Sequence, residues 1–298
     1  MSTTGKVKPS SILIIFWHGL GDFILATPAL REFYRHNPGC RLGIAVRQMV
    51  HDSGILDRCP YFDMVHVIPE VEDREHYRKK LEKYLQAGNM IRREHGYEKL
   101  VCIKHRPAWR YGIHKIQRTA NELGVGPITD TRTELYLSDQ DRSQARSWLQ
   151  EHGYEENNYI FLHRQTANPV KDMPEDVAAR VLLQLPPLPV IEVGKTYSIH
   201  DRHINFSFAL LEKARLIVVA DSVFLHAANA LGKDIAIAYF SLMPGIIDEV
   251  RPLDVKCRSI ESYSGSFILL RKINWICQRI LFEAFFKPLM IIRKKATP

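Results

Sequence analysis

An apolar, β-branched run that ends in a glycine-spaced turn constrains the fold more than any other feature of the chain. Residues 12–16 predict a buried strand, and Gly19, Gly21 and Asp22 follow it closely. Such a turn leading into a helix is the repeating unit of an α/β sheet. Its loop lies at the carboxyl ends of the strands, where ligands bind, so we expect Asp22 to face a site. The glycines are expected to allow positive φ and close approach of a ligand.

A helix is expected after this loop, with Thr27 as its cap and Pro28 as its first residue. A dinucleotide-binding fingerprint would require Gly or Ala at position 24, where this chain has Ile24. The loop is therefore not typical of a dehydrogenase.

The size and composition predict a globular protein of two domains. The chain has 298 residues, of which 46% are apolar and 25% charged, and a domain usually holds about 100 to 200 residues. The cysteines are odd in number, scattered and without a Cys-x-x-Cys pair, which disfavours a disulfide framework and a thiolate zinc site. They are Cys40, Cys59, Cys102, Cys257 and Cys277. These features predict a cytoplasmic protein.

Short apolar strands alternate with helical segments along the chain, which predicts parallel sheets covered by helices. The expected strands after the first are 41–46, 64–68, 99–103, 159–162, 190–193, 216–220 and 235–240, and the early helices follow Pro28, Glu72 and Pro107. A polar helix over 138–152 ends at Gly153, and residues 155–158 are typical of a hinge. We therefore expect a first domain over 1–153 and a second over 159–298.

The net charge of +8 indicates an anionic partner: nucleic acid, a phosphorylated substrate or an anionic membrane. Lys and Arg are spread along the chain without a basic face interleaved with aromatics, so we expect no nucleic-acid partner. Their one local concentration is C-terminal, where residues 267–292 have helical periodicity and Arg293-Lys-Lys follows. Charges interrupt this helix too often for a membrane span. It either packs across both domains or lies on an anionic membrane surface.

A polar loop follows the expected strand 159–162 and precedes a helix opened by Pro174. Its side chains stand at the carboxyl end of a strand, where they could donate hydrogen bonds to phosphate oxygens. They are His163, Arg164, Thr166 and Lys171. A solvated loop is the alternative for each of them.

A third segment begins with the buried strand 216–220, which meets Asp221 and Ser222 at the start of a helix ended by Gly232. Free N–H groups at a helix start can bind an anion, although Asp221 could also be a simple cap. His226 lies one turn after Ser222 and can face the same crevice. A histidine within a helix is otherwise more often part of the core.

These segments carry a family resemblance. The matching stretches are His18 to Arg31, Lys171 before Met173-Pro174, and Asp221-Ser222 with His226 to Gly232. Together they resemble the bacterial heptosyltransferases, the ADP-heptose:lipopolysaccharide glycosyltransferases of glycosyltransferase family 9. The resemblance extends from the first strand to the helix that ends at Gly232.

The resemblance implies an α/β fold of the GT-B type, in which two Rossmann-like domains face each other across a cleft. By likeness, Asp22 is the general base and Lys171 steadies the leaving diphosphate. The other implied donor-binding residues are Thr166, Asp221, Ser222, Val223 and His226, and the implied acceptor-binding residues are His18, Gly19 and Gly21. The implied reaction inverts the anomeric centre and needs no metal or other cofactor.

The implied partners are a nucleotide-sugar, ADP-heptose, and a lipopolysaccharide-core or other surface saccharide at the inner face of the membrane. The chain departs from the family at two places. Val223 replaces a glycine that lets phosphate approach the backbone, and Ser241 to Gly245 replace a Gly-Pro-Thr-like loop. These departures favour the alternative of a non-catalytic relative that binds nucleotide-sugar or glycan.

The sequence predicts no metal site, because no set of residues has the spacing of metal ligands. His200 and His203 are separated by a helical step but lack an obvious third ligand. We expect both to be surface residues.

Overall fold

The computed structural model describes residues 10–71, 77–105, 113–198, 203–241 and 246–262. Several sequence predictions lie outside the described residues. These are the C-terminal helix over about 267–292, Cys277, His200 and residues 242–245 of the loop after the last predicted strand.

The first half of the chain forms a sheet of four parallel strands in the order β3-β2-β1-β4. Its elements are β1 (Ser11–Phe16), α1 (Leu20–His36), β2 (Arg41–Arg47), α2 (Gln48–Asp52), β3 (Met64–Ile68), α3 (Tyr77–Glu94), β4 (Lys99–Ile103) and α4 (Lys115–Leu123). All residues of the central strand β1 are buried, as expected for a strand covered on both faces.

The second half forms a sheet of five parallel strands in the order β6-β5-β7-β8-β9. Its elements are α5 (Asp139–Glu151), β5 (Ile160–His163), the 3-10 turn η1 (Pro169–Lys171), α6 (Glu175–Leu182), β6 (Val190–Glu192), α7 (Ile204–Lys213), β7 (Leu216–Ala220), α8 (Val223–Ala230), β8 (Ile235–Phe240), α9 (Ile246–Val250) and β9 (Cys257–Glu261). The strands predicted from hydrophobic patterning are confirmed, and β9 is an additional one.

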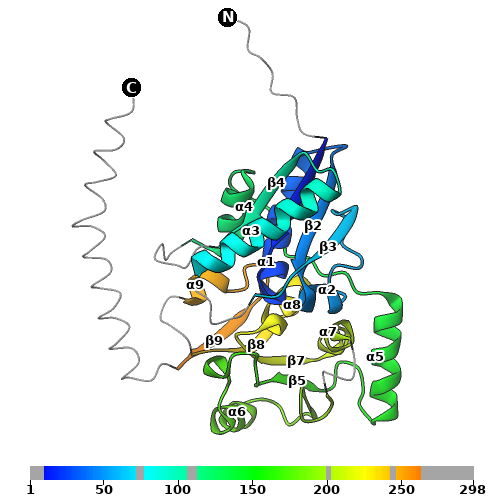
Figure 1. The fold of residues 1–298 in the computed structure, drawn as a ribbon. Helices are drawn as coiled ribbons and strands as arrows, with labels where there is room; N and C mark the ends of the chain where they lie inside the picture. The colour runs from blue at the N-terminus through cyan, green and yellow to red at the C-terminus, as the bar shows by residue number, and fades with distance from the viewer. Residues whose placement is uncertain (1–9, 72–76, 106–112, 199–202, 242–245, 263–298) are drawn as a thin grey trace, which may run out of the picture.

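The two sheets lie at opposite ends of the molecule, and α1 and α8 meet between them (Figure 1). The largest cluster of buried apolar side chains includes Phe16 of β1 and Phe23 of α1 together with Phe224 of α8 and Phe240 of β8. This core therefore runs through both halves. Removing this apolar surface from water stabilises the contact between the halves as well as each half alone.

Helix α1 begins at Leu20, with Gly19 as its N-cap, so the prediction that Thr27 caps the helix and Pro28 opens it is wrong. Pro28 lies inside the helix, where it has no N–H to donate to the carbonyl of Ile24. The hydroxyl of Thr27 donates to that carbonyl instead, at 2.7 Å. A side-chain hydrogen bond thus replaces the missing backbone bond and lets the helix continue through the proline.

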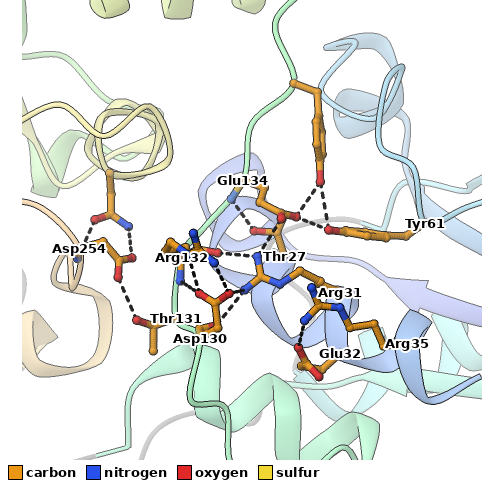
Figure 2. A network of polar contacts seen from close by, with 12 residues as sticks. Thr27, Arg31, Glu32, Arg35, Tyr61, Asp130, Thr131, Arg132, Glu134 and Asp254 are labelled. Atoms are coloured by element: carbon orange, nitrogen blue, oxygen red, sulfur yellow. Dashed lines mark hydrogen bonds and ion pairs between the residues drawn. The ribbon is translucent and has the colours of Figure 1, made fainter.

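Residues 124–138, which we call the strap, connect the two halves and are bound to α1 by Arg31 (Figure 2). The buried guanidinium of Arg31 donates to the backbone carbonyls of Asp130 and Arg132, at 2.8 and 3.0 Å. It also pairs with the carboxylate of Glu134 at 2.7 Å, and the N–H of Glu134 donates to Thr27 at 2.9 Å. Residues of the ATPALR stretch therefore hold the strap against the first half.

The strap is bound to the second half as well. Asn229 of α8 donates to the hydroxyl of Thr133 at 2.8 Å and accepts the N–H of Asp254 at 3.2 Å. The hydroxyl of Thr131 donates to the carboxylate of Asp254 at 3.0 Å (Figure 2). The connection between the halves is thus hydrogen-bonded on both sides.

Helix α5 packs against α7 of the second half, whereas the predicted boundary assigns it to the first domain. Arg142 of α5 pairs with Glu212 of α7 at 2.9 Å, and the rings of Trp148 and Phe206 meet edge-on at 6.0 Å. The chain therefore crosses between the halves through the strap, and the expected hinge at 155–158 lies within the second half. The polar sequence of α5 does not reveal which half its buried face contacts.

The chain returns to the first half at α9. Glu249 of α9 is buried and pairs with Arg118 of α4 at 2.9 Å. The ring Nε2 of His114 lies 3.0 Å from the carbonyl of Arg251. These contacts join the two halves beside the strap.

Cys40, Cys59, Cys102 and Cys257 are free thiols, as the scattered cysteines predict. Among the helices of the described ranges, none combines the length and apolar character that crossing a bilayer requires.

Candidate functional site

A cleft of about 1260 Å³ lies between the halves and is lined by residues of both. The predicted site residues in its lining are Gly19, Gly21, Asp22, Thr166, Lys171, Asp221, Ser222, Val223 and His226. His18 is not a lining residue. Nearly all of the residues singled out in the sequence, from three separate segments, therefore meet at one cavity.

Four strands bring these residues together. The strand order reverses between β1 and β4 in the first sheet and between β5 and β7 in the second. Ligands of parallel sheets bind outside the carboxyl ends of strands at such reversals. Asp22 follows β1, Lys115 follows β4, Lys171 follows β5 and Asp221 follows β7.

Asp22, in the first turn of α1, forms an ion pair with Lys115, the first residue of α4. Lys115 Nζ is 2.5 Å from Asp22 Oδ1, and 22% and 25% of the two side chains are exposed. Burial raises the pKa of Asp22, but the Lys115 ammonium lowers that pKa well below its ordinary value. Burial lowers the pKa of Lys115, but Asp22 raises it above its ordinary value. Both groups are therefore charged at neutral pH.

His18 belongs to a histidine pair near Asp22 rather than to the cleft lining. Its ring stacks on His105, with centroids 4.3 Å apart, and its Nε2 lies 3.1 Å from the carbonyl of Ile103. His105 has a positive φ of 37°, and its Nε2 is 2.8 Å from the hydroxyl of Thr119. Burial lowers the pKa of both histidines, so both rings are neutral at pH 7.

Lys171 and Asp221 form the second ion pair of the cleft, on the wall opposite Asp22. Lys171 Nζ is 2.9 Å from Asp221 Oδ2, and only 6% of the Asp221 side chain is exposed. Asp221 is not the helix cap that the sequence allowed. Ser222 is the N-cap of α8, and its hydroxyl accepts the N–H of Phe224 at 3.3 Å.

His163 supports the start of α8 from β5. Its Nδ1 lies 3.0 Å from Ser222 Oγ, and its ring packs against Phe224 with centroids 4.5 Å apart. Burial lowers the pKa of His163 to about 4, so the ring is neutral at pH 7. The cap hydroxyl is thus held between a backbone N–H and an imidazole. The first residues of α8 line the cleft, so the positive end of the helix dipole lies at the cleft.

Gly21 lies where α1 meets α8. A Cβ at position 21 would stand 2.7 Å from His226 Cδ2, whereas a Cβ at Gly19 would meet nothing within 4 Å. Gly19 has φ −81°, and Gly21 is not among the glycines with positive φ. The predicted positive φ is therefore wrong for both residues, and Gly21 allows close approach of a helix. Burial lowers the pKa of His226 to about 4.

Thr166 and Arg164 have partners within the second half. The Thr166 hydroxyl donates to the carbonyl of Asn168 at 2.7 Å, and its N–H donates to Asp172 at 2.6 Å. Arg164 pairs with Glu192 at 2.7 Å and does not line the cleft. These bonds shape the loop that carries Lys171.

Sequence reasoning does not find Lys115. It stands 93 residues from Asp22 and belongs to no motif, and its place soon after the end of β4 was the one available signal. His203 is exposed as predicted, and its Nδ1 lies 3.0 Å from the carbonyl of Ser53 at the rim of the cleft. In the described part of the chain, no three His, Cys, Asp or Glu side chains are grouped to hold a metal ion.

No protein-family model and no curated protein matches the chain by sequence. Solved structures match it in shape. A glycosyl transferase family 9 protein from Veillonella parvula gives a TM-score of 0.63 at 16% identity, over 85% of this chain and 86% of that one. The Escherichia coli ADP-heptose lps heptosyltransferase II gives 0.59 at 15% identity, over 92% and 99%. The chain has the GT-B fold.

The same GT-B fold relates the chain to the E. coli heptosyltransferase WaaC solved with ADP-2-deoxy-2-fluoro heptose. The TM-score is 0.51 at 15% identity, over 91% of this chain and 98% of that one. The predicted architecture, two Rossmann-like halves that face each other across a cleft, is thereby confirmed.

Proposed function

We propose that this chain is a glycosyltransferase that moves heptose, or a related sugar, from a nucleotide diphosphate onto a saccharide acceptor. The observation that carries the proposal is the opposition of two charge pairs across one cleft. Asp22 and Lys115 stand on the wall of the first half, and Asp221 and Lys171 on the wall of the second. A carboxylate facing an ammonium and a helix start is the set of groups that sugar transfer from a diphosphate requires.

In the proposed reaction, an acceptor hydroxyl oxygen attacks C1 of the donor sugar from the face opposite the diphosphate. The new oxygen–C1 bond forms while the bond from C1 to the diphosphate oxygen breaks. The electron pair of the broken bond leaves with the diphosphate, and the hydroxyl proton passes to Asp22. Attack from the opposite face inverts the configuration at C1.

The second half stabilises the leaving group. Negative charge grows on the departing diphosphate, and Lys171 and the N-terminus of α8 at Ser222 present positive charge to it. Because these groups are fixed before the reaction, they need little reorganisation as the charge develops. We therefore propose a transfer that uses no metal or other cofactor.

We propose ADP-heptose as the donor and a lipopolysaccharide-core or other surface saccharide as the acceptor. The names of the E. coli structures of the same fold, which include ADP-heptose and lps, support this choice. The net charge of +8 suits an acceptor on the anionic inner face of the cytoplasmic membrane. Sedimentation with phosphatidylglycerol vesicles, compared with phosphatidylcholine vesicles, tests the peripheral membrane location.

Replacing Asp22 by Asn tests the transferase directly. We expect Asp22→Asn to lower sugar transfer about 10²- to 10⁴-fold, because the variant lacks the base, while ADP still binds. Mass spectrometry of products from ADP-, UDP- and GDP-sugars with truncated core glycolipids measures the transfer. Asp139→Asn is the matched control, since Asp139 is fully exposed on α5. Transfer that is equal in Asp22→Asn and the wild type would contradict the proposal.

A non-catalytic relative that binds nucleotide-sugar is the second candidate, and Val223 favours it. Val223 is the first residue of α8 and lines the cleft where a phosphate would approach the backbone. This candidate predicts that ADP-heptose binds with no Asp22-dependent turnover on any acceptor. Val223→Gly is expected to strengthen binding of the diphosphate under both candidates, so turnover alone separates them.

A further inference from the structure

Asp22 is held in a state that suits a base poorly. Its Oδ1 lies 2.5 Å from Lys115 Nζ, and the pKa of Asp22 is far below its ordinary value. A general base is most effective when its pKa is near the working pH, because a stronger base accepts the proton more readily. The charged or titratable groups that face Asp22 are His18, His105, Lys115 and His226. Burial keeps the three histidines neutral, so Lys115 is the cation that weakens Asp22.

Both lysines in the described lining of the cleft are paired with a carboxylate before a donor enters. Lys115 neutralises Asp22, and Lys171 neutralises Asp221. A bound diphosphate adds at least two negative charges to a lining that also contains the carboxylate of Asp52. Lys115 lines the same cavity as Lys171, and it is close enough for Asp221 to raise its pKa and for its own charge to lower that of His226. Its ammonium is therefore drawn toward an incoming diphosphate.

We propose that Lys115 is a mobile positioning residue that holds Asp22 in the empty cleft and turns to the diphosphate when the donor binds. The inference rests on the proposed function and adds a residue to it. Donor binding then releases the carboxylate at the moment when a base is needed. The released Asp22 is a stronger base, and the leaving group gains a second cation from the opposite half. In the absence of donor, the ion pair with Lys115 also keeps the carboxylate of Asp22 from being unpaired in the cleft.

The test is a double-mutant cycle on ADP affinity, measured by isothermal titration calorimetry of the full chain. We expect Lys115→Gln to weaken ADP binding about 10-fold or more, because the variant loses a charged hydrogen bond to the diphosphate. Asp22→Asn is expected to strengthen ADP binding several-fold, because it frees Lys115. In the Lys115→Gln background, Asp22→Asn should lose most of this gain. Lys115→Arg should retain most of the affinity, and Lys99→Gln, at an exposed position of β4, is the matched control.

Two results would overturn the inference while the proposed function stands: ADP affinity unchanged in Lys115→Gln, or an equal gain from Asp22→Asn in both backgrounds. If the wild type transfers no sugar and binds none of ADP, UDP and GDP, the proposed function itself fails. Lys115→Gln alone leaves a carboxylate unpaired, whereas the double variant removes both charges. If Lys115→Gln alone does not fold, the ADP affinity of the double variant can still be compared with that of Asp22→Asn. The difference between these two variants then gives the effect of Lys115→Gln on ADP binding.

Discussion

At Gly21 the contact between the two halves leaves no room for a side chain. The nearest atom to an added Cβ belongs to His226, whose buried ring is fixed in α8 of the other half. Gly21 therefore joins the loop that carries Asp22 to the helix whose start faces the diphosphate site. The absence of a Cβ at Gly21 allows α1 and α8 to approach this closely.

We expect Gly21→Ala to lower the free energy of unfolding by about 1 to 3 kcal/mol through overpacking and to reduce transfer, because α8 must move. His226→Ala removes the obstructing ring, so Gly21→Ala should cost less in that background. Urea unfolding of the four variants measures this coupling. Gly19→Ala, which meets no neighbour, should show none, and a coupling as large at Gly19 as at Gly21 would contradict the explanation.

At the scale of elements, α1 depends on one hydroxyl. Thr27 is fully buried, donates to the carbonyl left free by Pro28 and accepts the N–H of Glu134 in the strap. The Thr27 hydroxyl therefore lets α1 continue through Pro28 and also binds the strap to α1. Neither role is visible in the pattern Thr-Pro, which is more typical of a helix start.

We expect Thr27→Val to destabilise the protein by about 1 to 3 kcal/mol, because a buried carbonyl and a partly buried N–H lose their partner. Adding Pro28→Ala should recover part of the loss, since the new N–H can bond to Ile24. Thermal and urea unfolding of both variants check this. A Thr27→Val variant as stable as the wild type would refute the role of the hydroxyl.

At the scale of the whole molecule, the strap decides how the two halves are joined. Arg31 binds it to α1, Asn229 binds it to α8, and Arg118 pairs with Glu249 beside it. The cleft lies between these two joined halves, so the strap contributes to the relative placement of the two charge pairs.

Arg31→Met should lower the free energy of unfolding by about 3 to 5 kcal/mol, because the buried guanidinium is the partner of two carbonyls and two carboxylates. Arg35→Met is the control: the exposed Arg35 pairs only with Glu32 in the described contacts, and such surface pairs contribute about 0 to 1 kcal/mol (Figure 2). Urea unfolding measures both, and amide hydrogen exchange should show faster exchange in residues 124–138 of Arg31→Met. Equal losses in the two variants would contradict the proposed role of the strap.

Hydrophobic patterning alone determined the strands of both sheets apart from β9, because a strand buried on both faces must be apolar along its whole length. The positions of Asp22, Lys171 and Asp221 at strand ends followed from the same pattern, whereas the cleft between two halves that brings them together was implied only by the family resemblance. Local signals were misleading at Thr27 and Pro28, where the pattern Thr-Pro fits a helix start but lies inside α1. They were also insufficient for α5, whose polar sequence does not indicate the half that it packs against.

Tertiary structure decided which groups touch. The pair Asp22–Lys115 joins residues 93 positions apart, and Gly21 and His226 meet only because α1 packs on α8. A sequence pattern reports the face that a residue presents, with a period of two or 3.6, but not the partner that this face meets. Charge pairing and close packing act over a few ångströms, so they are settled only when the chain has folded.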